Sequence, residues 1–333
     1  MNLAHGGNLF AIARGRGWDW RDIADFSASI NPLGPSPRVF DAIRDAAGRI
    51  VHYPEREPQA LMEALGREWS VDPDQVLVGN GATELIHFLA RTQTFETVTL
   101  AVPVFSEFHR AFRASRCVPI RQNWPSTGLV VLSRPVNPTG FLPDLDPYLR
   151  QTTNPVIVDE SFLEFTGASS VTGLLSVRPN LFVLRSLTKY YALPGLRIGA
   201  LIGSADSIAA LRAQREPWQV NTFAEVAALA ALSDRIHYAP SADFVSRERA
   251  WLAGELEKLP GVQPHPSSAN FLYATLDSPV APLEAHLLEH KILIRDCGGW
   301  PGVADRNAVR IAVRSRAENE RLLAGWKEFS CAS

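Results

Sequence analysis

The sequence has few cysteines, no long apolar run and no excess of charge of one sign. Its three cysteines, Cys117, Cys297 and Cys331, are spread over 333 residues. Their spacing matches neither a disulfide framework nor a zinc site, and their odd number favours a reducing compartment. No apolar segment approaches the about 20 residues that span a bilayer, and the first residues lack the apolar core of a signal peptide. We therefore expect a soluble, cytoplasmic protein without a metal site.

Positive and negative charges nearly balance, with 33 lysines and arginines against 35 aspartates and glutamates. No run of basic residues stands out, which argues against a nucleic-acid or anionic-membrane surface and leaves small anionic ligands as partners. Repeats and low-complexity segments are also absent, which argues against solenoid and disordered classes. Because 333 residues exceed the usual size of a single hydrophobic core, we expect a large domain that carries a smaller one.

Short β-branched runs alternate with amphipathic helical patterns through the middle of the chain. Buried strands are predicted at 75–79, 97–102, 129–133, 155–160, 181–186 and 197–203, with helices such as 82–92 and 106–115 between them. This alternation predicts an α/β fold in which helices cover both faces of a mostly parallel sheet. Ligands of such folds bind at the carboxyl ends of the strands.

The pattern changes after residue 205 to longer helices, at 204–215, 223–234 and 241–259, and strands return at 270–276, 292–297 and 308–314. We expect this tail to pack with the proline-rich entry at 30–46 as a small domain. The predicted division is a small-domain segment at 1–44, a large domain at 45–230 and the rest of the small domain at 231–333.

Motifs with ligand chemistry follow the predicted strands. The stretch VGNGATE at 78–84 joins a strand to a helix through a glycine-rich turn. It is a candidate phosphate cradle, although an ordinary turn capped by Thr83 has the same pattern. In RPVNPTG at 134–140, Asn137 stands where its amide could reach a ligand, while Asn-Pro and Thr-Gly also form tight loops.

Two further motifs carry charged residues. Asp159 closes the apolar strand of VIVDESFLEF, where a carboxylate is costly unless it is paired; it is a candidate partner of a cationic ligand group, or a helix N-cap. Glu160 could be a surface charge. The stretch RSLTKYYALPGLRIG then offers Lys189 as an imine-forming amine and Arg197 as an anion partner. A lone lysine is usually a solvated surface charge. The presence of four such motifs at strand ends favours instead a ligand-binding site that includes Lys189.

This order of motifs resembles that of the pyridoxal-phosphate enzymes of the aspartate-aminotransferase fold (fold type I), over nearly the whole chain. The resemblance implies an α/β/α sandwich, a smaller α/β domain built from both termini, pyridoxal 5′-phosphate as cofactor and a homodimer. It implies two catalytic residues, Lys189 bonded to the cofactor aldehyde and Asp159 paired with the pyridine nitrogen. The other implied cofactor contacts are Asn137 at the ring hydroxyl, Phe105 at the ring face, Gly81, Ala82, Thr83, Ser186, Thr188 and Arg197 at the phosphate, and Tyr53 at the phosphate of the neighbouring subunit.

One departure distinguishes the chain from many aminotransferases, because Phe162 stands where they have a tyrosine three residues after the strand-end aspartate. Together with HGGN at 5–8, DFSASINPLGPSP at 25–37 and LIRDCGGWPG at 293–302, it makes the chain resemble the threonine-phosphate decarboxylases of cobalamin biosynthesis. Of these features, HGGN and the Phe162 motif favour the decarboxylases over the related histidinol-phosphate aminotransferases. This resemblance implies a carboxy-lyase that converts O-phospho-L-threonine to (R)-1-amino-2-propanol O-2-phosphate and CO2. The substrate contacts that it implies are His5, Gly6, Asn31, Asn137, Arg295 and Arg310.

Several alternatives stay open at this point. His5 could belong to a frayed terminus, Asn31 to a turn and Arg295 to an exposed edge strand. The cofactor motifs do not separate decarboxylation from amino transfer, because the Cα bond that stands perpendicular to the cofactor ring is the one that breaks. Nor do they separate threonine phosphate from serine phosphate, since one methyl group discriminates by only about 1–3 kcal/mol. A non-catalytic regulatory protein of this fold is disfavoured, because both Lys189 and Asp159 are present.

Overall fold

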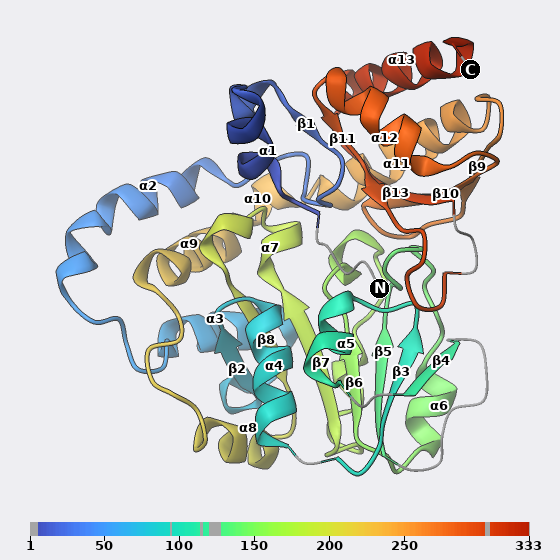
Figure 1. Ribbon diagram of the computed structural model, residues 1–333. Coiled ribbons are helices and arrows are strands. Elements are labelled where there is room, and N and C mark those ends of the chain that lie inside the picture. The colour runs from blue at the N-terminus through green and yellow to red at the C-terminus, as the bar shows by residue number, and fades with distance from the viewer. Residues whose placement is uncertain (1–5, 94, 114–115, 120–127, 304–306, 333) are drawn as a thin grey trace.

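A seven-stranded sheet of order β2-β8-β7-β6-β5-β3-β4 forms the centre of the computed structural model, which describes residues 6–93, 95–113, 116–119, 128–303 and 307–332 (Figure 1). Strand β8 runs antiparallel to both of its neighbours, and the other described pairs are parallel, so the prediction of a mostly parallel sheet is confirmed. The strands are β2 Val76–Gly79, β3 Val98–Val102, β4 Arg116–Pro119, β5 Leu129–Ser133, β6 Val156–Asp159, β7 Leu181–Ser186 and β8 Gly199–Ile202.

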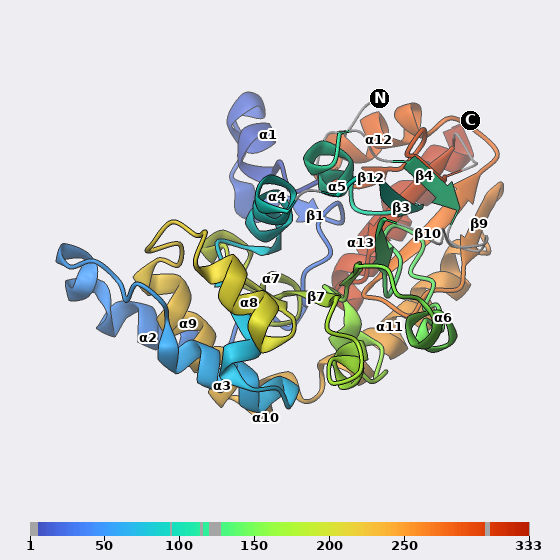
Figure 2. The same ribbon diagram turned by 90° about the horizontal axis from the view of Figure 1, so that it is seen from below.

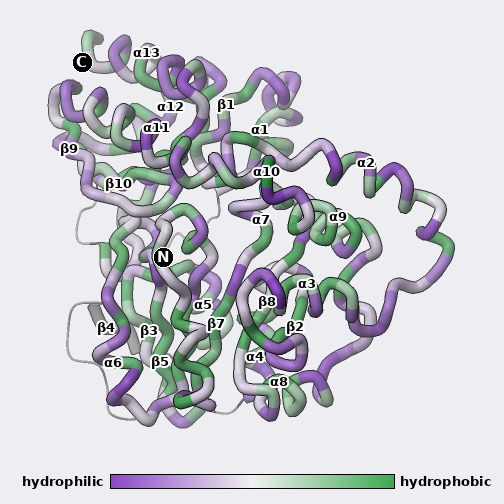
Figure 3. Tube along the Cα trace, turned by 180° about the vertical axis from the view of Figure 1, so that it is seen from behind, coloured by the Kyte–Doolittle hydropathy of each residue, from purple (hydrophilic) through white to green (hydrophobic). Residues whose placement is uncertain are grey.

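Helices cover both faces of this sheet because successive strand residues point to opposite sides. In β2, Leu77 packs in one apolar cluster with α4, α5 and α8, whereas Val76 and Val78 pack in another with α2, α3 and α9. Figure 3 shows the corresponding concentration of hydrophobic residues along the central strands. The helices of this part are α2 Pro37–Asp45, α3 Gln59–Trp69, α4 Ala82–Thr92, α5 Ser106–Ala111, α6 Asp146–Gln151, α7 Leu187–Tyr190, α8 Ala205–Arg212, α9 Thr222–Ser233 and α10 Arg235–Tyr238.

A second, antiparallel sheet of order β12-β13-β10-β9 carries α11, α12 and α13. Strand β1 pairs in parallel with β11, which attaches the N-terminal residues to the C-terminal part of the chain. The elements are α1 Leu9–Arg16, β1 Ala24–Asp25, α11 Ser241–Leu256, β9 Val262–His265, β10 Phe271–Leu276, α12 Val280–Glu289, β11 Ile292–Leu293, β12 Arg295–Asp296, β13 Ala308–Ala312 and α13 Arg316–Ala332.

Residues 30–46 do not all pack with the C-terminal tail. Helix α2 lies along α9, on the side of the molecule away from α12 and α13 (Figure 2). The reason is apolar burial, because Val39 of α2 belongs to the cluster that α3 and α9 form on the large sheet. The predicted domain boundaries near 44 and 230 stay predictions. None of the described helices is long and apolar enough to cross a membrane.

Candidate active site

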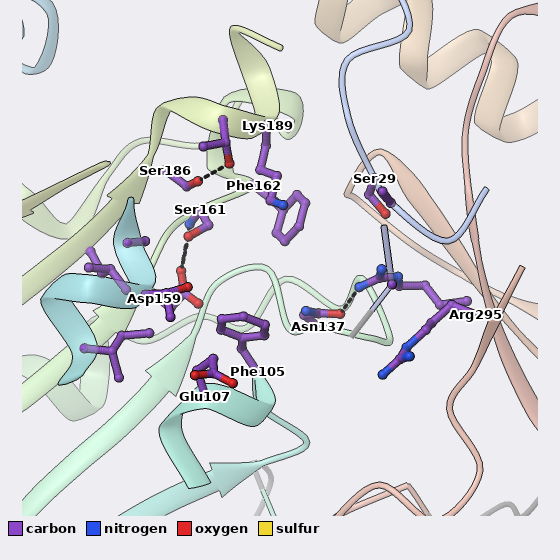
Figure 4. Close-up of a pocket in the computed structure, with 18 of the residues that line it drawn as sticks. Ser29, Phe105, Glu107, Asn137, Asp159, Ser161, Phe162, Ser186, Lys189 and Arg295 are labelled. Atoms are coloured by element: carbon purple, nitrogen blue, oxygen red, sulfur yellow. Dashed lines mark hydrogen bonds between the residues drawn. The ribbon is translucent and has the colours of Figure 1, made fainter. Parts of the chain in front are cut away.

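A cavity of about 460 Å3 lies between the carboxyl ends of the large sheet on one side and residues of the N-terminal segment, β12 and β13 on the other. Figure 4 shows Asp159 and Ser186 at the ends of strands of the large sheet and Lys189 on the helix that follows, with Ser29 and Arg295 on the opposite side of the cavity. The cavity therefore forms where strand ends meet residues from both ends of the chain. Its lining includes most of the residues that the sequence motifs predicted: Gly6, Ala82, Thr83, Phe105, Asn137, Asp159, Ser186, Thr188, Lys189, Arg197, Arg295 and Arg310.

The turn before α4 has the features of an anion cradle. Gly81 has φ +81°, and a Cβ atom there would lie 2.5 Å from Nη2 of Arg197. A Cβ atom at Gly199 in β8 would likewise lie 2.5 Å from the backbone nitrogen of Ala82. Glycine at both positions lets the guanidinium and β8 approach the start of an 11-residue helix, where backbone N–H groups and the helix dipole favour a negative charge.

The segment after β7 brings hydroxyls and an amine together. Oγ of Ser186 and Oγ1 of Thr188 lie 2.7 Å apart, and Lys189 follows on the short helix α7. Burial lowers the pKa of Lys189 from 10.5 to about 8, and the charges of Arg310 and Arg197 act in the same direction. Lys189 therefore carries an amine that loses its proton near pH 8, and the unprotonated amine is the form that attacks an aldehyde.

Asp159 ends β6 inside the cavity. Its Oδ1 accepts hydrogen bonds from the backbone N–H of Ser161 at 3.0 Å and from Oγ of Ser161 at 2.5 Å. Burial raises the pKa of Asp159, while the two bonds from Ser161 and the charge of Lys189 lower it. A buried carboxylate held in this way would be stabilised further by a cationic ligand group.

Glu160 is not a surface charge, as the sequence allowed. Its side chain is fully buried, and it pairs with Nη1 of Arg185 at 2.8 Å and accepts hydrogen bonds from Ser170 Oγ and the N–H of Val171. The alternation of side chains along β6 explains this, because Asp159 faces the cavity and the next residue faces the other way.

Arg310 joins three parts of the chain at the cavity wall. It lies in β13 and is buried; Nη1 donates to Oδ1 of Asn137 at 2.7 Å, and Nη2 donates to the backbone oxygen of Ser27 at 2.7 Å. Arg295 of β12 is its partner in the antiparallel pairing. The guanidinium carbon of Arg295 lies 5.1 Å from the ring centroid of Trp300, within the range of a cation–π contact.

Two phenylalanines supply apolar walls. Phe105 immediately precedes α5, and Phe162 follows β6. The ring of Phe162 packs edge-on against Phe271 with centroids 5.1 Å apart, and Nζ of Lys189 lies 5.9 Å from the Phe162 centroid. A tyrosine at 162 would place a hydroxyl in this wall, where Phe162 offers no hydrogen-bonding group.

Several predicted site residues lie elsewhere. Asn31 is buried outside the cavity, and its Nδ2 donates to the carbonyl oxygen of Tyr190 at 2.8 Å and to Oγ of Ser241 at 2.9 Å. Tyr53 is 81% exposed and stacks on Trp218 with ring centroids 4.8 Å apart. Gly81 supports the cradle without lining the cavity. His5 lies outside the described residues. Contacts of these residues with substrate or cofactor stay predictions.

Some lining residues were not singled out from the sequence. Ser27, Ser29 and Trp300 lie within motifs that carry the family resemblance, DFSASINPLGPSP and LIRDCGGWPG, and this was the only available signal for them. Glu107 and Arg110 also line the cavity, and Glu107 pairs with Arg110 at 3.1 Å. Both lie in the amphipathic pattern of α5, where the sequence does not distinguish a charge that lines a cavity from a surface charge.

Metal-ligand chemistry occurs in one group of side chains within the described part of the chain. His286, His290 and Glu328 offer ligand atoms that lie within 4.8 Å of one another. None of the three lines the cavity, so this group takes no part in the candidate site.

Comparisons with known proteins cover most of the chain. The threonine-phosphate decarboxylase of Salmonella typhimurium is 35% identical, over 98% of this chain and 96% of the relative, and the histidinol-phosphate aminotransferase of Moorella thermoacetica is 30% identical, over 93% and 86%. The crystal structure of L-threonine-O-3-phosphate decarboxylase from Porphyromonas gingivalis matches with a TM-score of 0.85 and 26% identity, over 92% of this chain and 99% of that one. Residues 21–325 match the model of the family "Aminotransferase class I and II". The chain therefore belongs to the class I and II aminotransferase family.

Proposed function

We propose that this chain binds pyridoxal 5′-phosphate and decarboxylates O-phospho-L-threonine, giving (R)-1-amino-2-propanol O-2-phosphate and CO2 as a step of cobalamin biosynthesis. The observation that carries the proposal is that the cavity holds the amine of Lys189 between two separate sets of anion-binding groups. Arg197 and the start of α4 form one set, and Arg295 and Arg310 form the other. The relative that is 35% identical supports the same activity.

The described residues fit the cofactor. The glycine turn at the start of α4, the guanidinium of Arg197 and the hydroxyls of Ser186 and Thr188 are a donor set suited to a phosphate. Asp159 is a buried carboxylate suited to a cationic pyridine nitrogen, and Lys189 is an amine of lowered pKa suited to an aldehyde. When bound, the cofactor supplies an electron sink for the bond that breaks at the substrate Cα.

Arg310 would orient the substrate in this proposal. Its guanidinium is buried and fixed by Asn137 and Ser27, so that it presents a preformed partner to a carboxylate. The direction in which Arg310 holds that carboxylate decides whether the bond to CO2 or the Cα–H bond breaks. Arg295 would bind the substrate phosphate, and the amine of Lys189 would deliver to Cα the proton that replaces CO2.

The amine of Lys189 has a direct test. Purified enzyme loaded with pyridoxal phosphate should show visible absorbance from covalently attached cofactor, and Lys189→Ala should abolish it. Lys258→Ala is the matched control, because Lys258 is exposed on the surface and lies outside the cavity. An unchanged spectrum in Lys189→Ala would contradict the assignment of this lysine.

The reaction itself is tested by supplying O-phospho-L-threonine without a 2-oxo acid. Release of one CO2 per substrate supports the decarboxylase. The second candidate is an aminotransferase of histidinol phosphate or a related phosphorylated amino acid, which the relative that is 30% identical favours. If the enzyme instead transfers the amino group between histidinol phosphate and glutamate at a comparable rate and releases no CO2, it is this aminotransferase and not the decarboxylase.

A homodimer and a cytoplasmic location are further parts of the proposal. Large apolar side chains lie exposed on and after α2, among them Phe40, Ile50, Val51 and Tyr53. Exposed apolar side chains that cover a continuous surface are typical of an interface. Equilibrium sedimentation should give twice the chain mass, and Val51→Asp should shift it toward the monomer and reduce activity. A fully active monomer would contradict the dimer. The free thiols of Cys297 and Cys331 are consistent with a reducing cytoplasm.

A further inference from the structure

The N-terminal pair Gly6 and Gly7 lies against the peptide group that holds Arg310. The backbone N–H of Gly7 donates to Oγ of Ser27 at 2.9 Å. A Cβ atom at Gly6 would overlap the carbonyl oxygen of Ser27 and would lie 3.0 Å from its carbonyl carbon. The same oxygen accepts the hydrogen bond from Nη2 of Arg310 at 2.7 Å. Gly6 and Arg310 therefore both lie against the carbonyl group of Ser27.

Ser27 is held rigidly at this junction. It is buried, and its backbone N–H and its Oγ both donate to Oδ1 of Asp25, at 2.8 and 2.6 Å. The backbone oxygen of Asp25 accepts in turn from Nη1 of Arg314 at 3.1 Å. These bonds hold the N–H and the Oγ of Ser27, whereas its carbonyl oxygen is the group that meets both Gly6 and Arg310, so a side chain at position 6 would press on the acceptor of Arg310.

Arg310 is sensitive to such a displacement. Its guanidinium has two acceptors among the described residues, Oδ1 of Asn137 and the oxygen of Ser27, and its Nε has no hydrogen-bond partner there. A planar guanidinium fork held at two points turns when one point moves, and its alignment with a carboxylate changes with it.

Resting on the proposed function, we propose that Ser27 is a positioning residue through which the Gly6-Gly7 segment sets the direction of Arg310. The position of the Gly6-Gly7 segment then determines how Arg310 binds the substrate carboxylate. Glycine stands at position 6 because a side chain there would push the carbonyl that aligns Arg310. This role differs from a direct contact between Gly6 and the substrate phosphate, which would act on the phosphate alone.

The test uses holoenzyme and two ligands that share a carboxylate but differ in the phosphate. O-phospho-L-threonine and L-threonine are each titrated, and binding is followed by the rapid change in the visible absorbance of the cofactor. Gly6→Ala should weaken both ligands by about the same factor, tenfold or more. Gly15→Ala is the matched control, because a Cβ atom at Gly15 in the same N-terminal region meets nothing within 4 Å, and it should change neither affinity.

The outcomes separate cleanly. Weakening of O-phospho-L-threonine alone would show that Gly6 acts on the phosphate and would overturn the proposal, as would no change for either ligand. Combined with Arg310→Lys, Gly6→Ala should add no further loss, because coupled residues are not additive; a full additional loss also overturns it.

If Gly6→Ala does not fold, Ser27→Ala replaces it in the test. This variant removes Oγ and keeps the carbonyl, and it should also weaken the binding of both ligands. The L-threonine titration stands even if O-phospho-L-threonine releases no CO2, so failure of the proposed function is recognised separately.

Discussion

Attachment of pyridoxal phosphate should follow the titration of an amine with a pKa of about 8. Burial, followed by the charges of Arg310 and Arg197, lowers the pKa of Lys189 from 10.5 to about 8. At pH 7 about 9% of such an amine is unprotonated, against about 0.03% for an ordinary lysine. The reactive form is therefore about 300-fold more abundant than it would be on the protein surface.

The assay mixes apoenzyme with pyridoxal phosphate between pH 6.5 and 10 and follows visible absorbance. The rate constant should rise about tenfold per pH unit well below 8 and level off above it. Arg310→Met should move the midpoint upward, because removing a like charge favours the protonated amine. Arg295→Met is the control: Arg295 lines the same cavity, but its charge is not among those that shift the pKa of Lys189. A midpoint near pH 10 in the native enzyme, or the same midpoint in Arg310→Met, would refute the reasoning.

Three further substitutions test other parts of the cavity. Asp159→Asn should keep the cofactor but lower turnover by about 30- to 5,000-fold, as truncation of a buried charge pair costs about 2–5 kcal/mol; steady-state rates measure this. Ser161→Ala removes the 2.5 Å bond to Asp159, so the pKa of Asp159 should rise and the acid limb of the pH–rate profile should move to higher pH. Trp300→Leu removes the ring beside Arg295 and should raise KM for O-phospho-L-threonine about 2- to 30-fold, without changing cofactor affinity, since such contacts contribute about 0.5–2 kcal/mol.

The buried strands of the large sheet could be predicted because their pattern is local. β5, β6 and β7 are short runs of mostly apolar residues, and all their residues are buried. β4 and β9 were not predicted, since both lie at sheet edges and include Pro119 and Pro264. An edge strand is exposed on one side and needs no continuous apolar run, so its pairing depends on the neighbouring strand.

The same distinction between local patterns and long-range contacts applies to the candidate site. Lys189 and Asp159 stand in contiguous motifs at the ends of predicted strands, and the structure brings them into one cavity. The hydrogen bond from Arg310 to Ser27 spans 283 positions of the chain, and no periodicity reports a contact at that separation. The sequence did not decide whether the side chain of Glu160 is buried or exposed. Its ion-pair partner, Arg185, lies on the neighbouring strand, and a single charged residue after a strand does not indicate such a partner.

The register of β12 and β13 places two arginines directly opposite each other, which no single sequence motif predicts. Arg295 and Arg310 are Cα partners in an antiparallel pair, and residues directly opposite lie on one face, where like charges destabilise each other. Burial lowers the pKa of Arg310, and the charge of Arg295 acts in the same direction. Aromatic rings offset part of this repulsion, with Arg295 at 5.1 Å from the Trp300 centroid and Arg310 at 5.4 Å from that of Phe271.

A ligand with one anionic group would neutralise one arginine and leave the charge of the other without an anionic ligand group. A ligand that carries a carboxylate and a phosphate at the spacing of the two guanidinium groups would neutralise both and remove the repulsion between them. The preference for a phosphorylated amino acid should therefore exceed the sum of what Arg295 and Arg310 contribute separately. This excess comes from the pairing of two short strands, so a substitution that shifts their register should lower it even when both arginines are kept.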